Sequence, residues 1–361
     1  MGLLNWRLPA VPALLFLYIA GVPATAHAQE KGATRITVDA AEIAIAGRVQ
    51  AQLNTSDANG VQAAEMILRR VRLGADVRVN DLVSGRVHVD FAGNEVSIAD
   101  AYMQLNLHPA AQLLAGRAYR QFGIMEQTSS LRVVPIERGL AVRGIEDYDL
   151  SAILSGLRYG GRDVGLQLRG SLPESSLGIG YSLGLFAGPV AGDAGEEQTQ
   201  QFVARLMANP LPGTRVGVAW SSRDFVREPA AETFETEAGQ AFAVDVEYGG
   251  PTPTAGAHLV AEFATGDFDP FVGEDFIGAQ LWAGYLFPVG ERVTLVEPLL
   301  RLSHASIDRV DPTAPDGGML ITPGVNVYLG GLNRLMLNYD IWRAATGVDG
   351  ASGKIQLQMA F

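Results

Sequence analysis

Residues 66–79 read MILRRVRLGADVRV, and this stretch alternates apolar with polar side chains. Ile67 and Val71 fall on one parity, whereas Arg70 and Arg72 fall on the other. Successive side chains of a β-strand point to opposite faces, so a period of two with one apolar face is typical of a strand between lipid and water. The stretch therefore predicts a membrane-spanning strand of a β-barrel.

The same alternation recurs along the whole chain. A first count gives seventeen alternating segments, whereas single-chain bacterial barrels have an even number of strands. The segment 152–161 breaks the regular order of short and long links, so we assign it to the end of a long loop or to a bulged extension of the strand that starts at Asp163. A soluble β-sandwich also alternates, but its buried face would not recur in so many consecutive strands.

We therefore expect an all-β fold, a transmembrane antiparallel β-barrel of 16 strands. The expected strands cover approximately residues 42–54, 65–79, 82–92, 96–107, 112–119, 163–172, 177–187, 200–208, 214–223, 240–249, 254–265, 277–287, 292–305, 319–329, 334–343 and 353–361.

Every second link between these strands is short, as at Asn80–Asp81 and Pro288–Glu291. Bacterial barrels have short periplasmic turns and longer extracellular loops, so both termini are expected on the periplasmic side. The expected extracellular loops include residues 188–199, 224–239, 267–276 and 306–318.

One link, from Arg120 to Arg162, is much longer than the others and contains apolar residues such as Phe122 and Val133. Loops of that size in a compact fold are usually functional or disordered. The apolar content favours packing, so we expect this link to be a long third extracellular loop that folds into the lumen and narrows it.

The two ends of the chain indicate export. Residues 1–28 resemble a signal peptide, because an apolar run from Leu8 to Val22 precedes the small-residue site Ala26-His27-Ala28. The barrel domain is then expected over residues 29–361. The last residues alternate up to Phe361, and this ending resembles the assembly signal of outer-membrane barrels. We expect the bacterial outer membrane as location, with outer-membrane lipid and the barrel-assembly machinery as partners.

Composition excludes several classes of function. The formal net charge is -12, and removal of residues 1–28, which contain one Arg and no acid, makes it -13, so nucleic acid is a poor partner. The chain contains 0 cysteines, which excludes disulfides and thiolate chemistry. Outside residues 1–28 no stretch of about 18 apolar residues occurs, so the barrel is the remaining spanning fold. Motifs for a metal or a cofactor are not found, and none is expected.

Four strings resemble the phosphate-selective porin O/P family, whose members are trimeric 16-stranded porins. The strings are IAGRVQAQL at 45–53, ILRRVRLGADV at 67–77, SIADAYMQLNL at 97–107 and LAGRAYRQFGIMEQTSSLRVVPIERG at 114–139. The resemblance implies a homotrimer, a third loop inside the lumen, and a constriction lined by arginines and loop lysines that draw anions through.

The arginines of the family match here, but the lysines do not. The matching arginines are Arg48, Arg69, Arg70, Arg117 and Arg138, whereas Glu126 and Leu131 stand where phosphate-specific members have lysine. A carboxylate in the constriction repels a phosphate dianion, which argues against phosphate selectivity. The predicted pore-lining and constriction residues are Arg48, Arg70, Arg72, Arg117, Glu126 and Arg138.

Strand parity places carboxylates on a different arc of the lumen from most arginines. This opposing wall is predicted to hold Asp245, Glu247, Glu262 and Glu297. One hypothesis is a transverse electric field between the two arcs; the alternative is that these charges pair locally and keep the lumen wet. Arg69 falls on the outward parity, where it needs an interface, a local bulge or a protomer contact.

The sequence thus predicts a porin, a water-filled channel for passive diffusion of small polar or anionic solutes, and not an enzyme. Two alternatives stay open. The first is a non-conducting structural or adhesin-like barrel. The second is an outer-membrane barrel hydrolase, for which the sequence offers histidines such as His88 but no recognisable arrangement of nucleophile, base and acid.

Overall fold

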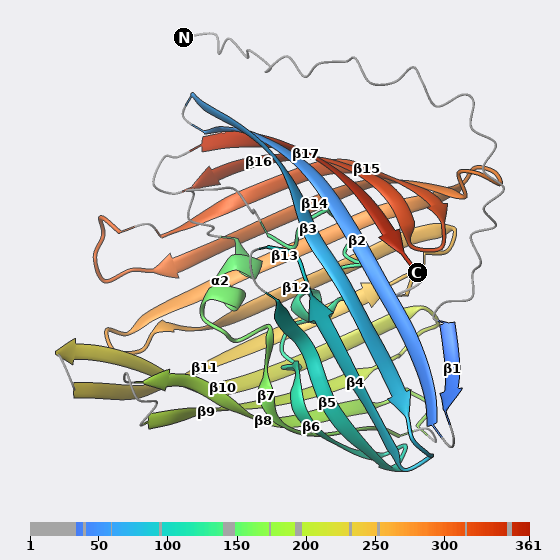
Figure 1. The fold of residues 1–361 in the computed structure, drawn as a ribbon. Helices are drawn as coiled ribbons and strands as arrows, with labels where there is room; N and C mark the ends of the chain where they lie inside the picture. Colours follow the sequence, from blue (N-terminus) through green and yellow to red (C-terminus); the bar gives the residue numbers. More distant parts are fainter. Residues whose placement is uncertain are drawn as a thin grey trace. The chain divides into compact units, whose positions relative to one another are not determined.

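Sixteen long strands each pair antiparallel with their neighbour in sequence, and β17 pairs with β2, so the sheet closes into a barrel (Figure 1). The computed structural model describes residues 34–38, 41–58, 60–93, 96–139, 149–172, 175–191, 197–230, 233–250, 253–314, 316–344 and 349–361. The prediction of a 16-stranded antiparallel barrel is confirmed. The predicted signal peptide, residues 1–28, lies outside the described residues.

The ring of strands comprises β2 (Ala41–Ala58), β3 (Val61–Arg78), β4 (Val83–Asp90), β5 (Ser97–His108), β6 (Ala111–Tyr119), β7 (Arg162–Ser171), β8 (Gly180–Ala191), β9 (Glu197–Ala208), β10 (Thr214–Ala230), β11 (Thr233–Tyr248), β12 (Gly256–Asp269), β13 (Glu274–Pro288), β14 (Leu295–Asp308), β15 (Gly317–Gly330), β16 (Asn333–Ala344) and β17 (Asp349–Ala360). A short additional strand is β1 (Thr34–Val38), and two helices are α1 (Ile124–Gln127) and α2 (Leu150–Gly156).

The alternation of polar and apolar residues determines which face of each strand points into the barrel. Gln356 is buried on the inner face of β17, whereas its neighbour Leu357 is 55% exposed on the outer face. Gln52, which pairs with Gln356 from β2, is buried on the same inner face. In lipid every backbone polar group needs an internal partner, and the closed ladder supplies it. No helix in the described part of the chain is long and apolar enough to span a membrane.

The barrel closes around the C-terminal residue. The main-chain N–H of Gly47 donates to the Phe361 oxygen at 2.9 Å, and the Phe361 N–H donates back to Gly47 at 3.2 Å. The Phe361 ring lies over Gly47, where a Cβ would come within 2.3 Å of it. Strand β1 pairs with residues 41–45 of β2, directly beyond the point where β17 ends.

A β-bulge in β3 resolves the position of Arg69. Gln50 pairs with Arg70 and Ala51 with Leu68, so Arg69 is the extra residue of the pair. A bulge shifts the parity of the residues that follow it. Ile67, which simple alternation places outward, therefore shares the inner face with its partner Gln52, and that assignment was wrong.

Most of the expected extracellular loops are continuations of strands. Strands β10 and β11 extend to Ala230 and Thr233, so the expected loop 224–239 is a hairpin. The same holds for β12 and β13, which end at Asp269 and begin at Glu274. Polar residues occur on both faces of these extensions, so the apolar alternation that reveals a strand is lost.

The link between β6 and β7 is the long exception. We call its described residues, 120–139 and 149–161, the inner segment. It contains α1 and α2, so residues 152–161 are not an independent strand, as expected, but their first part is helical. Asp149 caps α2 by accepting a hydrogen bond from the Ala152 N–H. In Figure 1, α2 is drawn among the strands of the barrel.

Two apolar clusters hold the inner segment against the wall. In the first, Phe122, Leu154 and Tyr159 pack with residues of β8–β14 such as Phe186 and Phe276. In the second, the packed residues are Ile124, Met125, Val133 and Val134 of the segment with Val260, Trp282 and Leu299 of the wall. Because these wall residues share the inner face, the apolar core of the protein lies inside the barrel.

Candidate functional site

The acidic wall, which we define as the inner faces of β11–β14, is covered and internally paired. Its carboxylates are the predicted Asp245, Glu247, Glu262 and Glu297, all buried. Arg205 donates to Asp245 at 2.7 Å, and Arg215 lies 2.6 Å from Glu247. The two pairs join β11 to β9 and to β10, so their charges are neutralised locally.

The other two carboxylates accept hydrogen bonds, one from the inner segment and one from the neighbouring wall. Glu262 accepts a hydrogen bond from the Met125 N–H of α1 at 2.9 Å. Glu297 accepts from the Asn326 amide at 2.8 Å and from the Tyr328 hydroxyl at 2.9 Å. The inner segment therefore covers this wall and keeps its carboxylates away from solvent, and the hypothesis of a transverse field stays a prediction.

Strands β15 and β16 hold the middle of the inner segment through its main chain. Asn338 accepts from the Ile136 N–H at 2.6 Å, and Asn326 donates to the Val134 oxygen at 2.9 Å. Arg334 donates to the Val133 oxygen at 2.7 Å. Backbone groups inside a lumen need partners, and wall side chains provide them here.

The arginine wall, which we define as the inner faces of β2–β6, stays more open to solvent. Arg72, Arg78 and Arg86 have side chains that are 16%, 61% and 37% exposed. Each of them has an acidic partner: Arg72 with Asp90 at 2.6 Å, Arg78 with Asp81 at 2.6 Å and Arg86 with Asp76 at 2.5 Å. The accessible charges of the lumen thus lie mainly on this wall.

Arg48 differs from these three arginines. Its Nη1 donates to the hydroxyls of Ser130 at 2.6 Å and Ser129 at 3.3 Å, both in the inner segment. Among the described residues no carboxylate lies within ion-pair distance of it. Arg48 stands opposite Arg72 in register and within electrostatic range of Arg162. This spot therefore combines two hydroxyls with a guanidinium that faces a second arginine.

A pair of glycines lets β6 and β7 extend beyond their neighbours. Gly116 faces Gly165 in register, and Gly116 has a φ of 129°. The β5–β6 pairing ends at Arg117 and the β7–β8 pairing begins at Gly165, but β6 and β7 stay paired up to Tyr119 and Arg162. Close to these glycines the two strands leave their neighbours and continue as a pair.

The tip of this hairpin reaches the lumen. Arg162 donates to Asp100 at 2.7 Å, and its guanidinium carbon lies 3.7 Å from the centre of the Tyr119 ring. Asp100 also lies 3.7 Å from the His88 ring on β4. Arg162 and Tyr119 therefore line the lumen on the side of Arg48, and sequence reasoning missed both.

Arg117 was predicted to line the constriction, and the register places it on the outer parity of β6 at the last position where β6 pairs with β5. It pairs with Ala101 and Val164, and Val164 is 54% exposed on the outer face. The next residue, Ala118, is buried on the inner face, so Arg117 falls on the outer parity. Its Nε donates to the Ile98 main-chain oxygen at 3.0 Å.

Glu126 and Arg138 stabilise the inner segment itself. Glu126 is 8% exposed and packs against Gly160, so it does not face solutes in the way that was expected. Burial, together with the nearby Asp149, raises the pKa of Glu126. Arg138 donates to the main-chain oxygens of Met125, at 2.9 Å, and Thr128.

Arg70 is a further predicted constriction residue that the structure buries. It is 7% exposed and donates to the Gln50 amide oxygen at 3.0 Å. Of the predicted constriction residues, Arg48 and Arg72 thus lie on the arginine wall with access to the lumen, whereas Arg70, Glu126 and Arg138 bond within the protein.

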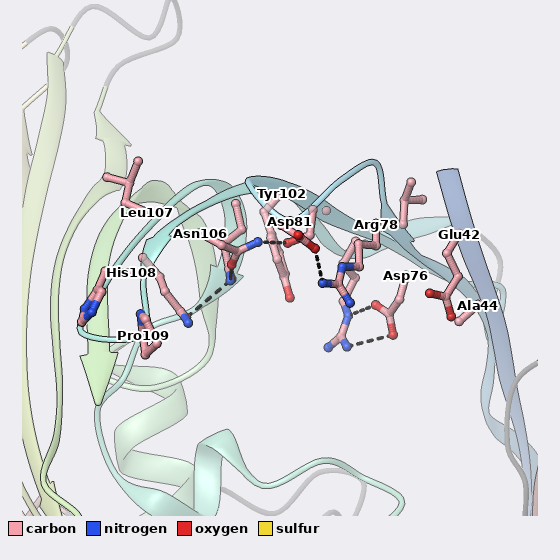
Figure 2. Close-up of a pocket in the computed structure, with 16 residues that line it drawn as sticks. Glu42, Ala44, Asp76, Arg78, Asp81, Tyr102, Asn106, Leu107, His108 and Pro109 are labelled. Carbon is pink, nitrogen blue, oxygen red and sulfur yellow. Dashed lines mark hydrogen bonds and ion pairs between the residues drawn. The ribbon is translucent and has the colours of Figure 1, made fainter. Parts of the chain in front are cut away.

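A recess of about 710 Å³ opens at the end of the arginine wall near the turns after β3 and β5 (Figure 2). Figure 2 shows the ion pair of Arg78 with Asp81 at its edge. Arg86, which pairs with Asp76, also lines the recess. Tyr102 adds a polar group to the lining. The recess therefore opens this end of the arginine wall to solvent.

Comparison with known families decides the identity of the chain. A model of the family described as phosphate-selective porin O and P matches residues 43–241, more than half of the chain. The chain belongs to this family. It is accordingly a porin of the bacterial outer membrane. No curated protein sequence matches it.

Solved porins share the fold at low sequence identity. An anion-selective porin from Comamonas acidovorans has a TM-score of 0.62 at 12% identity, over 89% of this porin and 100% of that chain. The outer membrane channel DcaP of Acinetobacter baumannii has a TM-score of 0.61 at 12% identity, over 91% and 100%. OmpF of Salmonella typhi, solved with daunomycin, has a TM-score of 0.60 at 13% identity, over 90% and 100%.

Proposed function

We propose that this porin is a water-filled channel for passive diffusion of small polar or anionic solutes, without catalytic activity, and that the solutes pass along the arginine wall. The observation that carries the proposal is the one-sided lumen. The inner segment covers the acidic wall, while Arg72, Arg78 and Arg86 keep contact with solvent. In this proposal the inner segment is the third extracellular loop and narrows the pore.

Arg48 supports a modest preference for anions. It is the guanidinium of the arginine wall that bonds to hydroxyls instead of a carboxylate. The neighbouring arginines are paired with aspartates, so the local excess of positive charge is small. A wall of matched pairs passes polar solutes and zwitterions, and it lacks the concentrated positive charge that tight phosphate binding needs.

The width of the barrel supports a conducting pore over a plugged structural barrel. Wall side chains alone do not fill a barrel of about sixteen strands. The two apolar clusters of the inner segment lie against β8–β14, its contacts with β2 and β3 are polar, and the recess of about 710 Å³ is lined by β2–β6. Water therefore has space at this end of β2–β6.

We further propose that three copies assemble through the outer face of β2–β7. Aromatic side chains form belts where a barrel meets the lipid interface. Apart from Phe91, directly after β4, the exposed large apolar residues from β3 to β8 are aliphatic, such as Leu73, Val87 and Leu166, whereas those of β9–β13 include Phe202, Phe242, Tyr248, Phe263 and Tyr285. A face without such a belt is suited to contact another protomer.

Swelling of proteoliposomes tests the channel. We expect liposomes that contain the protein to swell in isosmotic arabinose and in the sodium salt of a small carboxylic acid, and more slowly in the chloride salt of a cationic amine of similar size. Absence of swelling in all three solutes would favour the structural barrel. Faster entry of the cation would contradict the proposed path along the arginine wall.

A further inference from the structure

The inner segment carries one carboxylate, Glu137, that reaches a pair of adjacent arginines on β3. The Nε and Nη2 of Arg69 contact the two Glu137 oxygens at 2.5 and 3.1 Å, and Arg70 lies 3.4 Å away. Bidentate contacts between guanidinium and carboxylate are the strong, geometrically specific kind of ion pair. Glu137 is 5% exposed, so little water competes with the contact.

The bulge in β3 makes this contact feasible. Without it, Arg69 and Arg70 would point to opposite faces of the strand, and Arg69 would meet lipid, where a guanidinium is strongly disfavoured. With Arg69 as the extra residue, both guanidinium groups converge on one carboxylate. The local backbone is thus arranged around Glu137.

A third arginine fixes the main chain at the same place. Arg301 on β14 donates to the Glu137 main-chain oxygen at 2.9 Å, and its other nitrogens contact Thr322 and Asp340. Glu137 is therefore held on two sides of the barrel, by β3 through its carboxylate and by β14 through its carbonyl. The position of its charge is fixed relative to both walls.

We infer that Glu137 is a specificity-determining residue of the pore, an internal counter-ion that withdraws the charge of Arg69 and Arg70 from the path of solutes. The two arginines carry two positive charges and Glu137 removes one of them. Arg69 is still 35% exposed, so its charge reaches solvent once the carboxylate is neutral. The inference rests on the proposed function, because it concerns the selectivity of that same channel.

The ratio of chloride to potassium permeability, from the reversal potential in a KCl gradient across a planar bilayer, tests the inference. We expect Glu137→Gln to raise this ratio about threefold, since a close unpaired charge in a narrow lumen acts strongly on passing ions. Arg69→Gln is expected to lower the ratio below that of the natural protein. The double variant should fall between the two single variants, near the natural value.

Glu262→Gln is the matched control. It also replaces a buried acidic side chain that bonds to the inner segment, but Glu262 accepts from a main-chain N–H and not from an arginine pair, so the substitution alters a contact of the segment without freeing a guanidinium. We expect it to change the ratio by less than half as much as Glu137→Gln. An equal change in both variants would mean that Glu137 only holds the inner segment, and would overturn the inference.

The outcomes also separate this inference from the proposed function. If the natural protein does not conduct, or prefers cations, the proposed function fails. If it conducts and prefers anions while Glu137→Gln and Arg69→Gln both leave the ratio unchanged, only the role of Glu137 fails. Should Glu137→Gln not fold, Arg69→Gln alone decides, since an unchanged ratio in that variant contradicts the inference.

Discussion

At the scale of single residues, we expect Arg48 to contribute most to the proposed preference for anions. Its guanidinium faces two serine hydroxyls, whereas Arg215 is matched by Glu247. We expect Arg48→Ala to bring the chloride to potassium permeability ratio close to one. Arg215→Ala should change it little, because Arg215 and Glu247 lie away from the proposed path. Reversal potentials of the two variants check this, and equal effects would contradict it.

Glu126 should affect stability more than transport. Burial raises its pKa in the folded protein above the value in the unfolded chain. The folded state therefore loses stability as the pH rises from the unfolded pKa through the folded one, because the carboxyl must ionise in a buried place. Glu126→Gln removes that cost, and we expect it to raise the unfolding temperature by a few degrees at pH 8.

The heat-dependent gel shift of the folded barrel measures this effect. At about pH 4, near or below the unfolded pKa of about 4.3 for a glutamate, the gain from Glu126→Gln should vanish. The reverse pH dependence, or a gain that is the same at both pH values, would show that the carboxylate is not penalised by its burial.

At the scale of elements, the glycine pair of β6 and β7 determines where the hairpin leaves its neighbours. A Cβ on Gly116 would lie 2.3 Å from the Ala101 oxygen, and its φ of 129° disfavours other residues. We expect Gly116→Ala to destabilise the barrel by about 2 kcal/mol. Gly60 also has a positive φ, but a Cβ added there would meet nothing within 4 Å, so Gly60→Ala isolates the cost of the φ alone.

Refolding yield into detergent and the temperature of the gel shift report both glycine variants. If the Gly116→Ala protein were as stable as the Gly60→Ala protein, the close approach to Ala101 would be relieved at little cost in the free energy of unfolding. The hairpin would then not depend on the glycine at that position.

The alternation of apolar and polar residues made the strands predictable. Residues at which this alternation is broken could not be placed from the sequence. The sequence around Arg69 alternates on both sides, but the bulge that turns Arg69 toward Glu137 leaves no local pattern, since a single extra residue looks like a strand with one misplaced side chain. Arg162 and Tyr119 were missed for a related reason. Their lumen contacts depend on where the hairpin tip of β6 and β7 leaves the wall.

At the scale of the whole molecule, the side on which the inner segment packs determines which charges remain accessible. Strand parity could place Glu262 and Glu297 on the inner face, and both are buried there. It could not tell that the segment would cover them, because that depends on contacts between residues more than a hundred positions apart, such as Met125 with Glu262. The hypothesis of a transverse field was made without this contact and stays a prediction.

The proposed assembly of three copies can be tested with two matched substitutions. Val87 and Val244 are similarly exposed on the outer face, at 52% and 54%, but lie on different arcs of the barrel. We expect Val87→Trp to increase the fraction of monomer, because the ring would intrude between protomers. Val244→Trp should leave the trimer intact, since a tryptophan is tolerated against lipid. Mass measurement in detergent distinguishes them, and the opposite order would move the interface to the other arc.

The reversal potential of the natural protein in a planar bilayer, recorded under a KCl gradient at neutral pH, tests most directly whether solutes pass along the arginine wall. With the acidic wall covered and Arg48 bonded to hydroxyls instead of a carboxylate, we predict a chloride to potassium permeability ratio of about 2–5 and no block by micromolar phosphate. A ratio below one would place the path along carboxylates instead, and would contradict the one-sided lumen.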